Sequence, residues 1–145
     1  MSLFRHSIEL RAAPSKVFGA FEDPEAFAAW WGPDGFSNTF HVLELRTGGR
    51  WVYTMHGPDG RDYPNESEFL EVVPGALVRV KHVSLPRYEL SISLEPLGSG
   101  TRLSWLAEFE NETFAEKMRD FLESANEQNL HRLAAVLGEG RQPAD

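Results

Sequence analysis

Residues 88–95, Tyr88-Glu89-Leu90-Ser91-Ile92-Ser93-Leu94-Glu95, alternate without a break between apolar and polar side chains. A period of two is typical of a β-strand with one buried face and one exposed face. The glycine-containing turn 97–100 follows, after which the alternation resumes with Leu103, Trp105, Ala107 and Phe109. Because the turn between the two segments is short, the sequence predicts an antiparallel hairpin with one apolar face.

The same pattern extends outward from this hairpin over most of the chain. Five further segments are predicted as strands: 4–11, 36–45, 50–56, 66–73 and 77–84. Pro14 and Pro24 stand where helices can begin, and phenylalanines follow each at helical spacing. The sequence therefore predicts a curved antiparallel sheet of about six or seven strands, with two short helices after the first strand.

A long helix is predicted at the carboxyl end, from a cap at Asn111 or Thr113 to about Leu137. Its apolar residues recur at spacings of three and four: Phe114, Met118, Phe121, Leu122, Ala125, Leu130, Leu133, Val136 and Leu137. This stripe and the apolar face of the sheet must bury each other. We therefore predict an α+β fold in which the sheet wraps the carboxy-terminal helix, with the short helices and loops covering one end.

The size and charge of the chain limit its function. Its 145 residues fit one domain, predicted at 1–140, with a flexible tail at 141–145. The net charge of −8 disfavours nucleic acid and anionic membrane surfaces as partners. No apolar run reaches about 18 residues, so no membrane insertion is expected. The first residues lack the features of a secretory signal, and a cytoplasmic location is expected.

The inward-facing positions of the strands and helix predict an apolar cavity. The candidate ligand-binding residues are Trp31, Phe40, Trp51, Tyr53, Met55, Val80, His82, Tyr88, Leu90, Trp105, Met118, Leu122 and Asn129. Polar side chains interrupt the same faces at His6, Asn38, His82 and Asn129. Since a buried polar group without a partner costs about 1–3 kcal/mol, these residues as a group favour a cavity that holds water or a ligand. The alternative, a solid core in which each polar residue has a protein partner, stays open.

Three motifs have simpler structural interpretations. Trp30 and Trp31 are adjacent, so both cannot face the same way, and packing of the short helices is favoured while one of them can line the cavity. Gly48-Gly49 lacks the lysine of a phosphate-binding loop and is predicted to form a tight turn. Glu66 and Glu68 share the parity of apolar neighbours, but a bulge would turn both carboxylates to solvent, which we favour.

Few features of the sequence support a catalytic site or a metal site. The chain has no cysteine, which excludes disulfides and thiolate ligands. Its five histidines lack the spacing of a metal site, so neither a metal nor a cofactor is predicted. Gly-x-Ser-x-Gly is absent as well, although a Ser-His-Asp assembly from distant residues stays open.

Several motifs together resemble one family: Pro14, Val17 and Phe18; Trp30-Trp31-Gly32-Pro33; Glu44-Leu45-Arg46-Thr47-Gly48-Gly49-Arg50-Trp51; Gly57-Pro58-Asp59-Gly60; and Phe69, Glu71 and Pro74. They are similar to the START-like superfamily, also called SRPBCC, helix-grip or Bet v-like proteins. Within it, the chain resembles the branch named after the carboxy-terminal domain of the activator of heat-shock-protein-ninety ATPase. Thr47 replaces the family's usual proline.

The resemblance implies a small hydrophobic ligand, lipid-like or polyketide-like, held between the sheet and the helix without catalysis. Relatives in the superfamily also include cyclases and hydrolases, so an enzyme with His82, Glu66 or His6 as acid or base is the first alternative. A co-chaperone-like ATPase activator is the second, and it rests on the resemblance alone. A homodimer is open too, because exposed edge strands can pair.

Overall fold

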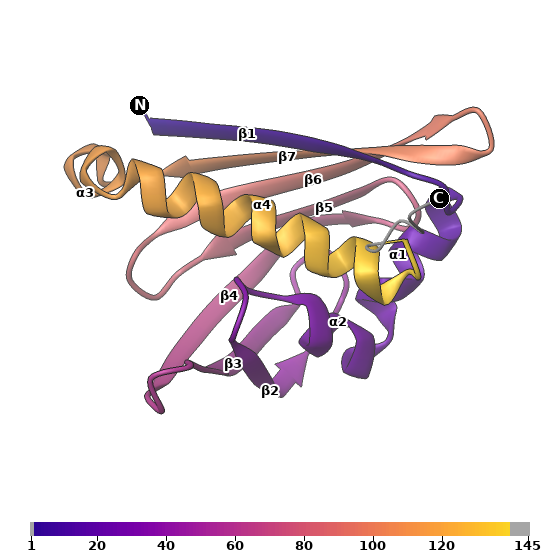
Figure 1. The fold of residues 1–145 in the computed structure, drawn as a ribbon. Helices are drawn as coiled ribbons and strands as arrows, with labels where there is room; N and C mark the ends of the chain where they lie inside the picture. Colours follow the sequence, from indigo (N-terminus) through magenta and orange to yellow (C-terminus); the bar gives the residue numbers. More distant parts are fainter. Residues whose placement is uncertain (1, 140–145) are drawn as a thin grey trace.

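The computed structural model describes residues 2–139, and the tail predicted at 141–145 lies outside the described residues. In chain order the elements are one strand, two helices, six strands and two helices. The long helix α4 (Arg119–Val136) lies across one face of a curved sheet, with the two short helices near one end (Figure 1). The predicted α+β fold and its order of elements are therefore confirmed.

Seven strands form the sheet in the order β1-β7-β6-β5-β4-β3-β2, and every neighbouring pair is antiparallel. The strands are β1 (Ser2–Leu10), β2 (Ser37–Leu43), β3 (Arg50–His56), β4 (Asp62–Val73), β5 (Leu77–His82), β6 (Tyr88–Leu97) and β7 (Gly100–Phe109). The first strand thus pairs with the last, and β1 and β2 form the two edges of the sheet.

The short helices begin at the predicted prolines, α1 at Pro14–Glu22 and α2 at Pro24–Trp30. Trp30 is fully buried, and its indole N–H donates to the carbonyl oxygen of Ala20 over 2.9 Å, which ties α2 to α1. Its ring stacks on Phe27, whose ring in turn lies 4.7 Å from that of Trp51. Trp30 therefore packs the short helices onto the sheet, as the sequence favoured.

The carboxy-terminal helix is not continuous. Asn111 caps α3 (Glu112–Lys117) by accepting from the N–H of Phe114 over 2.9 Å, but α4 begins only after Met118, whose φ is −100° and ψ 12°. Arg119 bonds to glutamates on both sides of the break, and its guanidinium lies 4.3 Å above the ring of Phe4 on β1. The prediction of one unbroken helix is wrong at Met118, next to the residue that makes this long-range contact.

The predicted apolar stripe is only partly correct as a result. Asn129, Leu130 and Leu133 are buried on α4, whereas Phe121 is 57% exposed and Val136 is 40% exposed. The prediction that these last two residues face the sheet is wrong. A stripe drawn continuously through the break at Met118 places Phe121 on the buried face. The buried residues of α4 do not continue the spacing of the residues before the break.

The turn before β3 depends on two glycines, as predicted. Gly48 has a φ of +84°, in the left-handed region, and the N–H of Gly49 donates to the carbonyl oxygen of Arg46 over 2.8 Å. A Cβ added at Gly49 would overlap the backbone carbonyl oxygen of Glu44, which cannot move without breaking the turn. The motif is therefore a backbone requirement rather than a phosphate site.

We predict that Gly49→Ala lowers the free energy of unfolding by at least about 2 kcal/mol, because the added methyl group collides with backbone. Gly19→Ala is the control, since no atom lies within 4 Å of a Cβ there and alanine favours the α1 helix by up to about 1 kcal/mol. Urea unfolding of both variants measures the difference. Equal stabilities would contradict the prediction.

Candidate functional site

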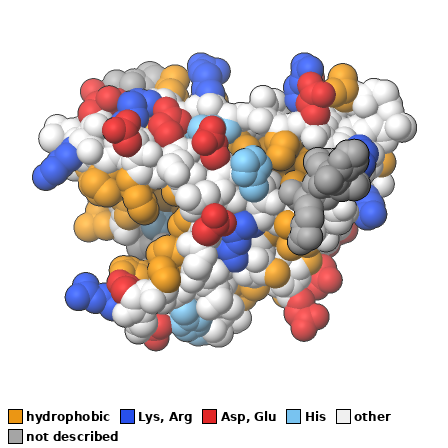
Figure 2. Space-filling view, viewed as in Figure 1, with side chains coloured by type: hydrophobic (Ala, Val, Ile, Leu, Met, Phe, Trp, Pro, Cys, Tyr) orange, Lys and Arg blue, Asp and Glu red, His pale blue; other side chains and the backbone are white. Residues whose placement is uncertain are grey.

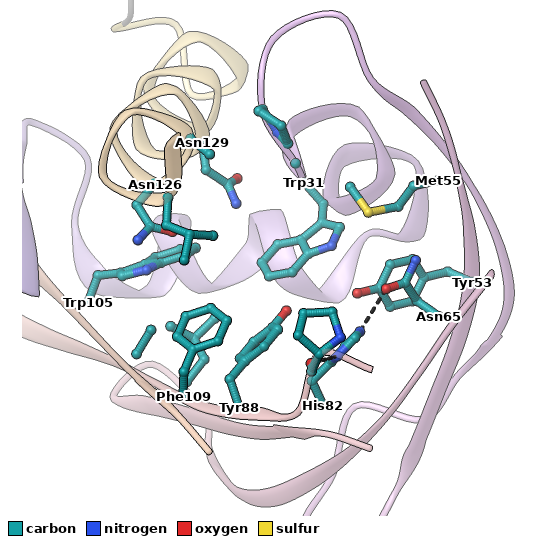
Figure 3. A pocket seen from close by; sticks show the side chains of 17 residues that line it. Trp31, Tyr53, Met55, Asn65, His82, Tyr88, Trp105, Phe109, Asn126 and Asn129 are labelled. Atoms are coloured by element: carbon teal, nitrogen blue, oxygen red, sulfur yellow. Dashed lines mark hydrogen bonds between the residues drawn. The ribbon is translucent and has the colours of Figure 1, made fainter. Parts of the chain in front are cut away.

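A cavity of about 170 Å³ lies between α4 and the sheet. The loop after α2, strands β3 to β7 and helix α4 all contribute to its wall (Figure 3). In the space-filling view the surface is hollowed beneath α4, and hydrophobic side chains surround the hollow (Figure 2). The wall consists of Trp31, Gly32, Pro33, Tyr53, Met55, Asn65, His82, Pro86, Tyr88, Leu90, Trp105, Ala107, Phe109, Leu122, Ala125, Asn126 and Asn129.

The structure brings most of the predicted site residues together. Those in the wall are Trp31, Tyr53, Met55, His82, Tyr88, Leu90, Trp105, Leu122 and Asn129. The alternation along each strand identified them, because side chains of one parity point to the same face of a sheet. That they contact a ligand stays a prediction.

Four predicted residues lie outside the cavity wall in the structure, contrary to the expectation that they line it. Phe40 and Trp51 pack with Phe27 in the aromatic cluster, with ring centroids 4.7 to 5.6 Å apart. Val80 is buried within the sheet, where it pairs with Phe69 and Leu90. Met118 lies at the break between α3 and α4. The position of a residue in the alternation predicts that its side chain lies on the inner face of the sheet. It does not predict which part of that face lines the cavity.

The sequence analysis missed two polar residues of the wall. Asn65 belongs to β4, which begins at Asp62, four residues earlier than predicted. Asn126 stands three residues before Asn129, so both occupy one face of α4. That spacing is a signal that could have found Asn126.

His82 is only 2% exposed, and both of its ring nitrogens lie within hydrogen-bond distance of protein oxygen atoms. Nδ1 lies 2.7 Å from the carbonyl oxygen of Pro86, and Nε2 lies 2.7 Å from Oδ1 of Asn65. Burial lowers the pKa of His82, and the bond to Pro86 only partly opposes this. The ring also stacks on Tyr88, with centroids 4.6 Å apart. With both nitrogens in contact with the protein, His82 positions its neighbours and does not present a free base.

The two tyrosines of the wall keep their protons. Burial raises the pKa of Tyr53 well above its ordinary value, and the neighbouring Tyr88 raises it further. Burial also raises the pKa of Tyr88, with a hydrogen bond from Tyr53 acting in the opposite direction. The wall contains no aspartate, glutamate, lysine or arginine. The cavity is therefore uncharged at neutral pH.

Four residues of the wall carry a buried polar atom without a hydrogen-bond partner in the described structure. They are Nε1 of Trp31, Nε1 of Trp105, Nδ2 of Asn126 and Oδ1 of Asn129. Each such group costs about 1–3 kcal/mol relative to a satisfied one. The wall is therefore poorly suited to be a closed core and well suited to a molecule that supplies partners.

Arg132 of α4 fixes the loop that carries Trp31. Its Nη1 donates to the carbonyl oxygens of Trp31, Gly32 and Pro33 over 2.7 to 3.2 Å. Its Nη2 donates to those of Ala29 and Phe36 over 2.8 and 2.9 Å. Burial lowers the pKa of Arg132, and the nearby Asp34 opposes this. The sequence analysis missed this residue, and no local pattern marks it, because all five acceptors lie about a hundred positions away.

The other predicted polar residues do not reach the cavity. His6 Nε2 lies 2.8 Å from Oε1 of Glu123 and is not part of the wall. Asn38 donates to the carbonyl oxygens of Ala28 and Trp31, a structural role. Glu66 and Glu68 are exposed, and the sheet register shifts after Phe69, so the predicted bulge and solvent exposure are confirmed.

A hydrogen-bonded series on an exposed part of the sheet has the order of a nucleophile, base and acid. Thr39 Oγ1 lies 2.7 Å from Nε2 of His56, whose Nδ1 lies 2.8 Å from Oδ1 of Asp62. The side chain of Asp62 is 66% exposed, and none of the three lines the cavity. Hydrolysis would also require oxyanion donors and a substrate pocket, so we assign no activity to this set. Within residues 2–139 no cluster suited to a metal ion was found.

A curved antiparallel sheet that wraps a carboxy-terminal helix, with a cavity between them, defines a START-like, helix-grip protein. A family model described as "Activator of Hsp90 ATPase homolog 1-like protein" matches residues 11–138. The chain belongs to this family.

Solved structures agree with this assignment. A protein from Arthrobacter aurescens is 28% identical with a TM-score of 0.86, over 99% of this chain and 88% of that one. A protein from Chromobacterium violaceum is also 28% identical, with a TM-score of 0.82 over 94% of this chain and 97% of that one. Curated proteins gave no match. No helix among the described residues is long and apolar enough to span a membrane.

The stability of the protein is predicted to fall as the pH drops below about 6.5, the ordinary pKa of histidine. There the unfolded chain binds a proton at position 82 that the folded protein, with its lowered pKa, does not bind. His82→Gln should therefore show a weaker pH dependence of unfolding between about pH 7 and about pH 5 than the wild type.

Urea unfolding across that pH range measures the effect. His131→Gln is the matched control, because His131 is exposed on α4, and it should keep the wild-type dependence. Identical dependence in His82→Gln and the wild type would refute the assignment of this acid sensitivity to His82.

Arg132→Lys is predicted to lower the free energy of unfolding by about 2 kcal/mol or more, because an ammonium group cannot span five carbonyl oxygens. Hydrogen exchange in the loop 31–36 should rise with it. Arg102→Lys, which alters only a surface pair with Glu9, should cost less than about 1 kcal/mol. Comparable losses in the two variants would show that the Arg132 bonds contribute little.

Proposed function

We propose that this protein binds a small, mostly apolar molecule in the cavity between α4 and the sheet. The observation that carries the proposal is the wall itself, in which aromatic side chains stand beside four polar groups without partners. Ligand sites are commonly apolar concavities with a few polar groups that orient the ligand, and this wall has that composition.

The size of the cavity bears on the size of the ligand. An engineered cavity of about 150 Å³ in another protein admits benzene. The 170 Å³ here is therefore matched to a molecule of about one ring. This favours a smaller occupant than the lipid-like or polyketide-like ligand expected from the sequence.

Neither alternative function has a separate observation in its favour. Of the three residues considered for acid–base catalysis, Glu66 and His6 lie outside the wall, and both ring nitrogens of His82 contact protein groups. The family description names an ATPase activator, but no observation on residues 2–139 adds support for a chaperone partner. Binding without catalysis is thus the proposal, and the cytoplasmic location and the homodimer remain expectations from the sequence.

Native mass spectrometry of freshly purified protein, followed by organic extraction, tests the proposal. We expect a bound small molecule in the wild type and its loss in Ala125→Phe, because Ala125 lines the cavity and a phenyl ring there would occupy it. Ala135→Phe is the control on an exposed position of the same helix and should retain the molecule. A wild type free of ligand, or equal retention by both variants, would count against a binding function for this cavity.

A further inference from the structure

We infer that the molecule bound in this cavity is a neutral compound of one flat ring that carries a hydrogen-bond acceptor such as a carbonyl oxygen, rather than a hydrocarbon or an ion. The inference rests on the proposed function and specifies its ligand. Three properties of the wall lead to it.

The first property is the absence of charge. None of the residues in the wall is an acid, a lysine or an arginine. Arg132 is near, but its guanidinium already donates to the carbonyl oxygens of the loop above the cavity. An ion that entered would lose its hydration and find no opposite charge, which is strongly unfavourable. The occupant is therefore neutral.

The second property is an excess of donors. The indole N–H groups of Trp31 and Trp105 can only donate, and neither makes a hydrogen bond of good geometry, although that of Trp31 lies near the hydroxyl group of Tyr53. Nδ2 of Asn126 is a third such donor. Among the residues of the wall, Oδ1 of Asn129 is the single buried acceptor atom without a hydrogen-bond partner. The occupant that best satisfies these groups carries more acceptors than donors, as a ketone, ester or ether does.

The third property is the arrangement of the aromatic side chains. The rings of Trp31 and Trp105 are stacked, with centroids 6.1 Å apart and planes inclined by 30°. The phenol of Tyr88 points from the sheet toward them, and Asn126 and Asn129 project from α4 on the opposite side (Figure 3). Flat aromatic walls pack closely against a flat ring. The polar groups of α4 then face one edge of the ring, where its acceptor belongs.

Acetophenone and α-methylstyrene form a matched pair that tests this inference, since they differ in a carbonyl oxygen against a methylene group. We expect acetophenone to bind at least about tenfold more tightly, because only it satisfies the unpaired donors. Benzoate, which adds a charge, should not bind measurably. Calorimetric titration of the 145-residue chain gives the three dissociation constants.

Two variants locate the effect. Trp105→Phe keeps an aromatic ring but removes the N–H, and it should weaken acetophenone several-fold while leaving α-methylstyrene unchanged. Trp51→Phe is the matched control, because its N–H is also buried and unpaired but lies outside the wall. It should change neither compound.

The outcomes separate this inference from the proposed function. Equal binding of the matched pair, or tighter binding of benzoate, overturns the ligand class while a cavity that binds small molecules stands. Binding of none of the three probes overturns the ligand class as well. The proposed function is then decided independently by whether the extracted wild-type protein releases a molecule that Ala125→Phe has lost.

Discussion

The loop between α2 and β2 has no sheet or helix partners for most of its carbonyl groups, and such groups need donors when they are covered. Arg132 supplies them from a helix that the chain forms a hundred residues later. Burying a guanidinium is costly, and here five carbonyl dipoles compensate it in place of a carboxylate. Because Trp31 belongs to this loop, the position of one wall of the cavity depends on the same contacts.

The inner face of the sheet is divided into a filled part and an open part. Near α2, Phe27, Trp30 and Trp51 interlock through ring contacts of 4.7 to 5.1 Å and leave little space. Under α4 the wall combines aromatic residues with small ones, among them Ala107 on β7 and Ala125 on α4, and the cavity lies there. The solid cluster therefore supplies packing stability, which allows the region under α4 to remain incompletely packed.

Elements that depend on local periodicity could be predicted from the sequence. Features that depend on contacts between residues far apart in the chain could not. Alternation along 88–95 and 103–109 identified β6 and β7, since side-chain parity is a local property. No local pattern marks the break at Met118, and the contact of Arg119 with Phe4 beside it joins residues at opposite ends of the chain. The same holds for Arg132, and for Asn65, which becomes a partner of His82 only after β4 pairs with β5. For the site, parity therefore gave the inner-face residues but not the boundary of the cavity.

The distribution of unpaired polar atoms argues for a binding role over an imperfect core. Eight buried side-chain atoms among the described residues lack a hydrogen-bond partner, and four of them, in Trp31, Trp105, Asn126 and Asn129, belong to this one wall, whereas those of His6 and Ser67 lie outside it. Two further cases lie directly against it, since Asn38 bonds to the backbone of Trp31 and the ring of Trp51 lies 4.9 Å from that of Trp31. Exchanging an asparagine for leucine or a tryptophan for phenylalanine would remove an unpaired group and its cost. Because the unpaired groups are concentrated where space is also left, their cost is best explained by a molecule that pairs with them.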